Sequence, residues 1–335
     1  MRVVENLVSF VPPAGGSVVT IGNFDGMHRG HTRIIELLRS VADRLSAIPV
    51  AITFEPHPLA VLAPERAPAV LTTIEEKLAL LGRCGVERCV VMRSEPALLS
   101  QAAEDFLASL VAHCRPRAIV EGPDFNFGKG RTGSIETLRA HADRWGYEVH
   151  EVPEIHCAEL PTHPRISSSS IRQALLDGRV EEANAMLGRP YRVVGTIVTG
   201  RGRGTGLGFP TANLNGSVHL LPQQAVYAAV AQFDDGELHL AAVNVGPQPT
   251  FDQAEPHVEA HLLDYAGDLR GHRLGLHFLA RLREQQKFAG TAQLAEQIQC
   301  DIEAAREWTS TVVTLHDYGV ISLGPPAKQD PQQAQ

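Results

Sequence analysis

Short apolar runs alternate with amphipathic ones over the first half of the chain. Residues 32–45 predict a helix with an apolar stripe, and further helices are predicted at 73–82 and 103–114. The stripe consists of Ile34, Leu37, Leu38, Val41 and Leu45. Strands are expected at "SVVTI" (17–21), "VAITF" (50–54), "RCVVM" (88–92), "RAIVEG" (117–122) and "YEVHEV" (147–152). This alternation predicts a doubly wound parallel sheet, with its ligand crevice at the carboxyl ends of the strands.

Two shorter features support the predicted helices and the position of the domain boundary. Thr73 and Glu76 have the spacing of a capping box at the start of the second helix. The stretch 165–188 looks helical after its serine run, and Gly188 and Pro190 then interrupt the chain. We expect an α/β domain over residues 1–187.

The pattern changes after residue 188. Short strand candidates separated by turn residues predict an antiparallel barrel or sandwich over 188–315. They lie at 191–200, 224–233, 238–246, 258–265 and 272–282. A last helix over 291–308 carries Leu294, Ile298, Ile302 and Ala305 on one stripe and is expected to pack on the barrel. Residues 316–335 form an extension whose polar, proline-rich end is expected to be disordered.

Composition limits the class of partner. Of the 335 residues, 44% are hydrophobic and 20% charged, and the net charge is -8. The negative charge argues against nucleic acid and anionic membranes as partners and favours small ligands bound by local basic clusters. Five scattered cysteines and the lack of a long apolar run predict free thiols in a cytoplasmic protein.

The decapeptide "GNFDGMHRGH" (22–31) joins the first predicted strand to the first helix. Backbone N–H groups at such a turn bind nucleotide phosphates. His28 and His31 are three residues apart with Asp25 just before them, so both imidazoles are expected on one helical face. They would stabilise charge on a phosphate. Zinc binding by these three side chains, or a purely structural turn with a capping histidine, are the alternatives.

Two further segments suit nucleotide chemistry. "GPDFNFGKGRTGS" (122–134) also follows a strand and is expected to share the crevice; Asp124 and Asn126 either contact a base or ribose or form a turn. "PRISSSSIR" (164–172) places serines between Arg165 and Arg172, which suits either a helix cap or an ATP polyphosphate.

The second half has its own phosphate-type loop, "GRGRGTGLGFPTANL" (200–214). Its alternating glycines and two arginines allow close approach to phosphates, although a flexible glycine hairpin would look the same. Thr211 and Asn213 supply hard oxygen ligands suited to Mg²⁺. Glu259, on a predicted strand, would accept a proton from an attacking hydroxyl, or it is an ordinary exposed strand residue.

Seven motifs in order make the chain, over about residues 17 to 310, resemble the bifunctional prokaryotic riboflavin kinase/FMN adenylyltransferases. They are "GNFDGMHRGH", "TFEPHP", "GPDFNFGKGRTGS", "ISSSSIR", "GFPTANL", "NVGPQPTF" and "VEAHLLDY". The resemblance implies a Rossmann-like nucleotidyltransferase domain followed by a small Greek-key β-barrel kinase domain. It also implies ATP, riboflavin and FMN as substrates, FAD as product, and Mg²⁺ bound with ATP.

The resemblance further implies roles for individual residues. His28 and His31 would stabilise the transition state of adenylyl transfer, and Glu259 would be the general base of the kinase. Thr211 and Asn213 would hold Mg²⁺, and Asp124 and Asn126 would contact flavin or nucleotide. The expected ATP and phosphate contacts are Gly22, Phe24, Asp25, Gly30, Arg165, Ser168, Ser169, Arg172, Gly200, Gly204 and Gly208.

The chain departs from the family pattern at a few positions. Thr199, Gly200 and Arg201 stand where the family often has His-Gly-Asp, and Ala225 replaces a usual glycine. The chain also continues past the usual end. One alternative is a non-catalytic flavin- or nucleotide-binding protein with decayed sites, against which the presence of His28, His31, Asn213 and Glu259 argues. The other is a single-activity FMN adenylyltransferase whose barrel is regulatory or degenerate.

Overall fold

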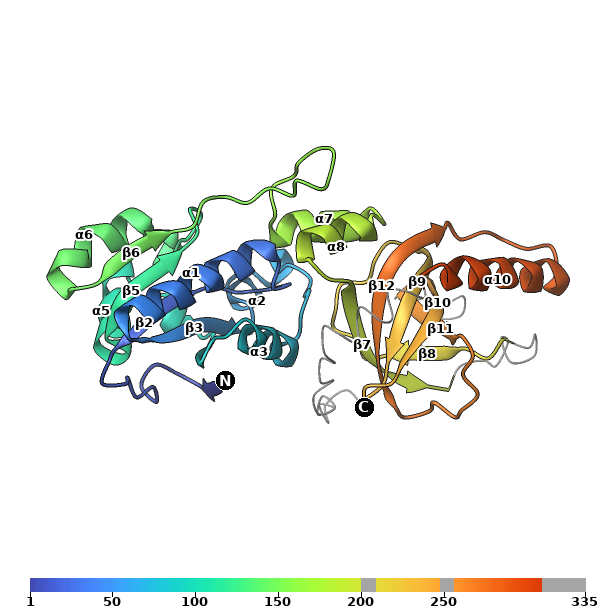
Figure 1. Ribbon diagram of the computed structural model, residues 1–335, viewed down its shortest axis with the longest axis horizontal. Helices are drawn as coiled ribbons and strands as arrows, with labels where there is room; N and C mark the ends of the chain where they lie inside the picture. The colour runs from blue at the N-terminus through green and yellow to red at the C-terminus, as the bar shows by residue number, and fades with distance from the viewer. Residues whose placement is uncertain (200–208, 248–255, 309–335) are drawn as a thin grey trace. The chain divides into compact units, whose positions relative to one another are not determined.

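The computed structural model describes residues 1–199, 209–247 and 256–308, which group into two compact units, Met1–Ser168 and Ser169–Gln335 (Figure 1). The division lies at the start of α7, so the helices before the barrel group with the barrel. The sequence-derived boundary after residue 187 stays a prediction of where the two functional domains meet. The extension over 316–335 and the loop 200–208 lie outside the described residues.

The first unit contains a six-stranded sheet in the order β1-β4-β3-β2-β5-β6, and every recorded pair is parallel. The five predicted strands are confirmed, and β1 was not predicted because it has only three residues. The strands are β1 (Arg2–Val4), β2 (Ser17–Ile21), β3 (Ile48–Glu55), β4 (Arg88–Arg93), β5 (Pro116–Glu121) and β6 (Glu148–Glu151).

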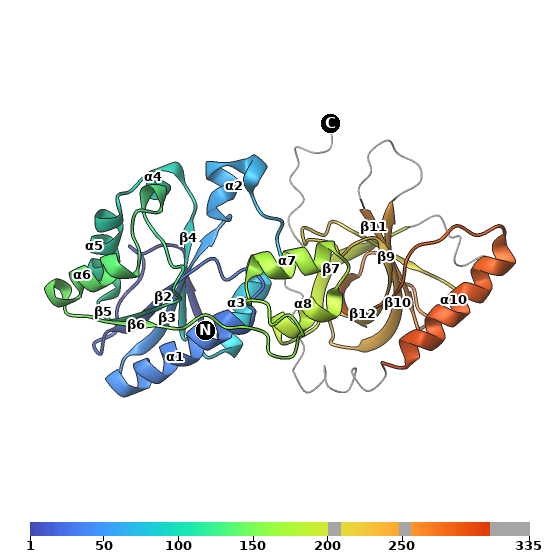
Figure 2. The ribbon, with the colours of Figure 1, turned by 90° about the horizontal axis from the view of Figure 1, so that it is seen from above.

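Helices lie on both faces of this sheet (Figure 2). The three predicted helices and the Thr73–Glu76 capping box are confirmed. The helices are α1 (Arg29–Leu45), α2 (Pro58–Leu62), α3 (Ile74–Arg83), α4 (Pro96–Leu99), α5 (Ala103–Cys114) and α6 (Ile135–Trp145), with single 3-10 turns at Pro64–Arg66 and Lys129–Arg131. The doubly wound α/β prediction is therefore confirmed.

The buried stripe of α1 is rotated slightly from the predicted one. Leu38 and Val41 are buried as expected, and Ile35 and Ala42 are the other buried residues. The remaining predicted positions are only partly buried: Ile34, Leu37 and Leu45. Residues 35, 38, 41 and 42 recur at helical spacing and form the face by which α1 packs on β2, β3 and β5. The amphipathic pattern located the helix correctly and its facing residues only in part.

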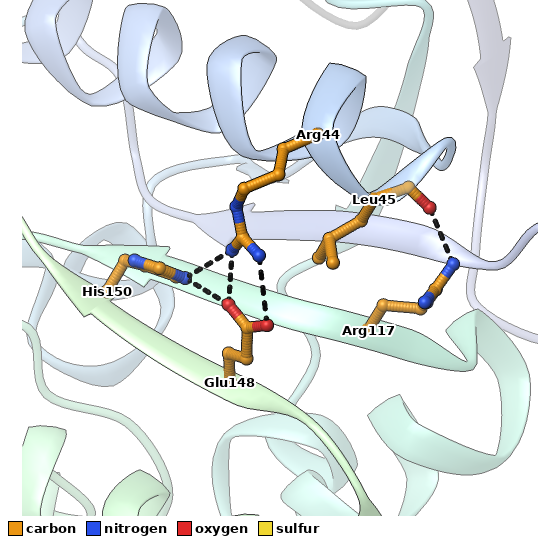
Figure 3. Close-up of polar contacts among 5 residues, drawn as sticks. All are labelled: Arg44, Leu45, Arg117, Glu148 and His150. Atoms are coloured by element: carbon orange, nitrogen blue, oxygen red, sulfur yellow. Dashed lines mark hydrogen bonds and ion pairs between the residues drawn. The ribbon is translucent and has the colours of Figure 1, made fainter.

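Polar contacts fix the carboxyl end of α1 to the sheet (Figure 3). Arg44 forms an ion pair with Glu148 of β6, whose carboxylate also lies 2.7 Å from His150 Nε2. Arg117 of β5 donates to the Leu45 carbonyl at 2.5 Å, which satisfies one of the acceptors left free at a helix end. The helix that begins at the histidine turn is thus held at its far end.

The second unit begins with α7 (Ser168–Leu176) and α8 (Val180–Leu187), followed by a closed antiparallel barrel. Strands β9 to β11 run as consecutive neighbours and β12 returns beside β9, which is the Greek-key order. The strands are β7 (Tyr191–Val198), β8 (Ala212–Asn215), β9 (Ala225–Gln232), β10 (Leu238–Pro247), β11 (Pro256–Leu262) and β12 (Arg273–Arg283).

The terminal helix α10 (Thr291–Arg306) packs on the outer face of the barrel, as predicted. Ile302 and Ala305 are buried against Ala228 and Val230 of β9, and Ile298 adds a partly buried contact. All five cysteines lie in the described part of the chain, and none of them forms a disulfide, as expected. In that same part, no helix combines the length and the apolar character needed to cross a bilayer.

Candidate functional site

The first candidate site lies at the carboxyl ends of β2 and β5, where the chain changes direction across the sheet. The connection after β2 leads to β3 on one side, and the connection after β5 leads to β6 on the other. Ligands of doubly wound sheets bind at such a switch point. Since β2 and β5 are parallel neighbours, the loops 22–28 and 122–134 leave the sheet side by side, as predicted.

The two histidines meet at the amino end of α1. His28 is the N-cap residue, and its Nδ1 accepts the backbone N–H of His31 at 3.3 Å. The two rings stack with their centroids 3.6 Å apart. His28 therefore caps the helix and stands with His31 at the positive end of the helix dipole, so the capping and phosphate-binding interpretations are compatible.

Phe24 and Gly30 support these rings. Phe24 is buried, and its ring packs edge-on against His31 with centroids 5.3 Å apart. A Cβ on Gly30 would lie 3.0 Å from His28 Nδ1, closer than side-chain packing normally allows. A Cβ on Gly22 would similarly press on the Phe24 ring at 3.2 Å. These three residues shape the turn that carries the histidines, and the buried Phe24 ring is part of its packing.

The Asp25 carboxylate is occupied by the protein itself. Its oxygens accept the backbone N–H groups of Leu71 at 3.1 Å and Thr72 at 3.0 Å, and the Thr72 hydroxyl at 3.2 Å. This commitment disfavours the zinc interpretation. In residues 1–199, 209–247 and 256–308, no three His, Cys, Asp or Glu side chains gather in a way that would hold a metal ion.

The segment before α7 joins the two loops of the first unit. Arg165 forms ion pairs with Asp124, in the loop after β5, and with Glu154 at 3.1 Å. Ser168 donates its hydroxyl to the Asp25 carbonyl at 2.8 Å. Asn126 donates to the Asp124 carbonyl at 2.6 Å, which is the turn-forming role considered from the sequence. Ser169 and Arg172 follow on α7 and belong to the second unit.

Sequence reasoning missed His57, although "TFEPHP" was noted as a motif. His57 caps α2, because its Nδ1 accepts the Leu59 N–H at 3.1 Å. Its Nε2 lies 3.0 Å from the Asn23 side-chain amide, in the histidine turn. Only the tertiary contact shows that His57 belongs to this site.

Lys77 of α3 is a buried cation near the same turn, with 5% of the residue exposed. Burial lowers the pKa of its ammonium group, while the charges of Glu55 and Asp25 act in the opposite direction. Burial likewise raises the pKa of the Glu55 carboxyl group. The Lys77 ammonium group and the carboxylates of Glu55 and Asp25 therefore partly offset each other's charge.

The second candidate site lies on the outer face of the barrel. Glu259 of β11 is directly opposite Asn213 of β8 and Asn244 of β10. Directly opposite residues on antiparallel strands share a face of the sheet. Their neighbours Val243, Val258 and Leu214 face the barrel interior and are buried. The structure thus brings Asn213 and Glu259 together and places Asn244, which sequence reasoning missed, on the same face.

Gln285 supports Asn244 from the segment after β12. Its Nε2 donates to Asn244 Oδ1 at 2.8 Å and to the Val245 carbonyl at 3.0 Å. A Cβ on Gly246 would collide with this amide, so the contact depends on glycine at that position. Thr211 precedes β8 and is half-buried, two residues from Asn213. Gly200, Gly204 and Gly208 lie outside the described residues.

Comparison with family models also divides the chain into two parts. An FAD synthetase family model matches residues 12–170, and a riboflavin kinase family model matches residues 187–309. The residues between the two matches include most of α7 and α8.

Curated relatives match the chain over both units. The bifunctional riboflavin kinase/FMN adenylyltransferase of Escherichia coli K12 is 36% identical over 298 residues, which is 88% of this chain and 94% of that protein. The Bacillus subtilis protein of the same description is 32% identical, covering 88% and 93%. A solved structure described as a macrolide-efflux protein from Streptococcus pneumoniae matches 91% of this chain and 98% of its own, with 31% identity and a TM-score of 0.82.

Proposed function

The chain belongs to the family of bifunctional riboflavin kinase/FMN adenylyltransferases, and on this premise we propose which residues carry each reaction. The enzyme phosphorylates riboflavin to FMN with ATP. It then adenylylates FMN to FAD with a second ATP, releasing pyrophosphate. The parallel-sheet unit is the adenylyltransferase and the barrel is the kinase.

In adenylyl transfer, an FMN phosphate oxygen attacks the α-phosphorus of ATP and pyrophosphate leaves. The attacking phosphate is already ionised at neutral pH, so positioning and charge stabilisation do the catalytic work and no strong base is needed. His28 donates from Nε2, because its Nδ1 is engaged by the His31 N–H. His31, stacked on it, binds the same phosphates. Gly22, Phe24, Asp25 and Gly30 hold the turn in place around them.

The segment 165–172 is the second phosphate contact. Arg165 is 40% exposed and paired with Asp124 and Glu154, so a phosphate group would compete with carboxylates for its guanidinium. Release of Arg165 would leave Asp124 free to contact the nucleotide or flavin, with Asn126 shaping its loop. Ser168, Ser169 and Arg172 complete the segment at the start of α7.

In the kinase reaction, the 5′-hydroxyl of riboflavin attacks the γ-phosphorus of ATP and ADP leaves. A primary alcohol is a poor nucleophile until its proton is removed, and Glu259 is the carboxylate that accepts it. The amides of Asn213 and Asn244 flank Glu259 on the same face and fix the polar surroundings of this base. Gly200, Gly204 and Gly208 are proposed to bind phosphates through their backbone.

Thr211 and Asn213 fit Mg²⁺, since a hydroxyl and an amide oxygen are hard ligands of the kind this ion prefers. When bound with ATP, the ion supplies charge neutralisation for the transferred phosphoryl group. Asn213 is held in β8 opposite Glu259, so a ligand of the metal and the base are fixed by one strand pair. Ala225 is fully buried opposite Val245, so the barrel accommodates this departure from the family pattern.

The observation that carries the assignment is the stacked histidine pair at the helix end that faces the switch point. The test is to incubate the purified protein with riboflavin, ATP and Mg²⁺ and follow FMN, FAD, ADP and pyrophosphate by chromatography. FMN should appear with ADP, followed by FAD with pyrophosphate. Conversion of added FMN but not of riboflavin would overturn the kinase assignment and favour a single-activity adenylyltransferase.

A further inference from the structure

Glu121 is a buried carboxylic acid at the edge of the sheet where the adenylyltransferase site lies. It is the last residue of β5, and 3% of it is exposed. The recorded backbone register of β2 with β5 covers Ser17 to Val19. Beyond it, the Ile21 N–H donates to Glu121 Oε1 at 2.6 Å. A side chain of β5 thus continues the contact between the strands at the residue where β2 ends.

The opposite side of β2 is held at the next residue. The Gly22 N–H donates to the Ile52 carbonyl of β3 at 2.9 Å. The end of β2 is therefore fixed from both neighbouring strands at the point where the loop to His28 begins. Of these two contacts, the one to β5 depends on a particular side chain.

A buried N–H group without an acceptor costs free energy, and Glu121 supplies the acceptor for the Ile21 N–H. Burial raises the pKa of its carboxyl group well above the usual value, although the Ile21 N–H and the Thr20 hydroxyl act in the opposite direction. A neutral carboxyl group still accepts a hydrogen bond, and glutamine reproduces its shape and its acceptor oxygen. The acceptor, rather than the charge, is what the geometry requires.

We propose that Glu121 is a positioning residue for adenylyl transfer, whose side-chain oxygen fixes the end of β2 and thereby the path of the loop that carries His28 to the phosphates. The inference rests on the proposed role of the two histidines. Glu121 does not act as a base, because the attacking FMN phosphate needs none. Small displacements of catalytic groups have large effects on rate, so a residue behind the loop can control it.

The experiment compares Glu121→Leu, which removes the acceptor, with Glu121→Gln, which keeps it. Both full-length variants are assayed for kcat and KM of FMN adenylylation, and for riboflavin phosphorylation in the same preparation. Glu121→Leu should lower kcat for adenylylation by about 10²-fold, with a smaller change in KM for ATP. Glu121→Gln should restore kcat to within a few-fold of the parent enzyme. Riboflavin phosphorylation should stay unchanged in both.

Glu151 provides a matched control. It lies directly opposite Glu121 in the β5–β6 register, but it is exposed and bonded to Arg139 at 2.7 Å. Glu151→Leu should leave both activities unchanged. Equal adenylylation by Glu121→Leu and the parent enzyme would overturn the proposal.

The conservative variant decides the matter if Glu121→Leu does not fold. A Glu121→Gln protein that phosphorylates riboflavin normally but has lost adenylylation would show that charge is essential, and the proposal would fail. The His28→Ala variant separates this result from the histidine assignment. If His28→Ala still forms FAD, the proposed function of the histidines is wrong; if it does not while Glu121→Leu remains active, only the role of Glu121 is wrong.

Discussion

The Nδ1 atom of His28 accepts the backbone N–H of His31 while the two imidazole rings stack 3.6 Å apart. A ring nitrogen that accepts a hydrogen bond carries no proton, so the proton of a neutral His28 resides on Nε2. The helix cap therefore sets the tautomer that can donate to a phosphate. One contact serves both the start of α1 and the chemistry proposed for it.

The two roles of His28 can be separated by substitution. Asparagine is a good N-cap but has no equivalent of Nε2, whereas alanine has neither function. Both His28→Asn and His28→Ala should lower kcat for adenylylation by about 10²- to 10³-fold, the usual effect of losing one transition-state donor. Only His28→Ala should also lose about 1 kcal/mol of stability against denaturant. Equal loss of riboflavin phosphorylation in either variant would contradict the assignment of His28 to one unit.

Gly30→Ala should have two opposing effects: alanine favours the helix, but its Cβ would crowd the His28 ring. Alanine in a helix is favoured over glycine by up to about 1 kcal/mol. The new Cβ, however, would lie 3.0 Å from His28 Nδ1 and 3.1 Å from its Cε1. We expect the ring to shift and adenylylation to fall by at least about tenfold, since catalysis is sensitive to such displacements.

Gly290 is the control for this substitution. It precedes α10 with an extended backbone (φ -167°), and a Cβ there meets open space. Gly290→Ala should not change either activity. A fully active Gly30→Ala enzyme would mean that the His28 ring position has no bearing on the rate.

Glu259→Gln should strongly slow FMN formation from riboflavin while FMN adenylylation persists. Loss of a general base costs about 10²- to 10⁴-fold in kcat. Glu303→Gln, on the exposed side of α10 and bonded to Gln299 at 3.1 Å, is the control and should be fully active. Chromatography of flavins from riboflavin and from FMN measures both steps, and kinase turnover at the parent rate would rule out Glu259 as the base.

The contacts in Figure 3 predict a pH-dependent contribution to stability. Hydrogen bonds from Arg44, and then from His150, lower the pKa of the Glu148 carboxyl group from 4.5 to about 2. A carboxyl group with a lowered pKa in the folded state stabilises the protein above its unfolded pKa and loses that effect as the pH falls through the folded value.

Glu148→Gln should therefore lower the denaturant midpoint slightly at neutral pH, because the ion pair is exposed. The difference from the parent protein should shrink below pH 4.5 and disappear near pH 2. Chemical denaturation across this pH range is the measurement. A difference that grows on acidification would mean that the variant affects something other than this ion pair.

Local patterns predicted most of the fold. The strand at 17–21, the turn and α1 follow from adjacent residues, and so does the Thr73–Glu76 capping box. Strand β8 was missed because its four residues follow a glycine-rich loop and carry no clear alternation. The strand exists because β7 and β11 pair with it on either side. The position of β8, and of Asn213 within it, is therefore determined by tertiary strand pairing and not by the local sequence.

The residues of the candidate sites also fall into those that the sequence identified and those that only the structure revealed. His28 and His31 were identified from their spacing, and Asn213 and Glu259 from the chemistry of their side chains. Their function also depends on partners that no spacing reveals. Examples are Glu121 for the end of β2, Thr72 for Asp25, and His57 for Asn23.

By itself, the sequence determined the order of helices and strands, the two-part division and the residue types available for phosphate chemistry. These properties depend on neighbours along the chain, where periodicity and turn chemistry act. The tertiary structure decided which buried donor meets which acceptor, because strand order and register join residues as distant as Ile21 and Glu121. It likewise set two amides opposite Glu259, since the pairing of β11 with β8 places Asn213 there and the pairing of β11 with β10 places Asn244.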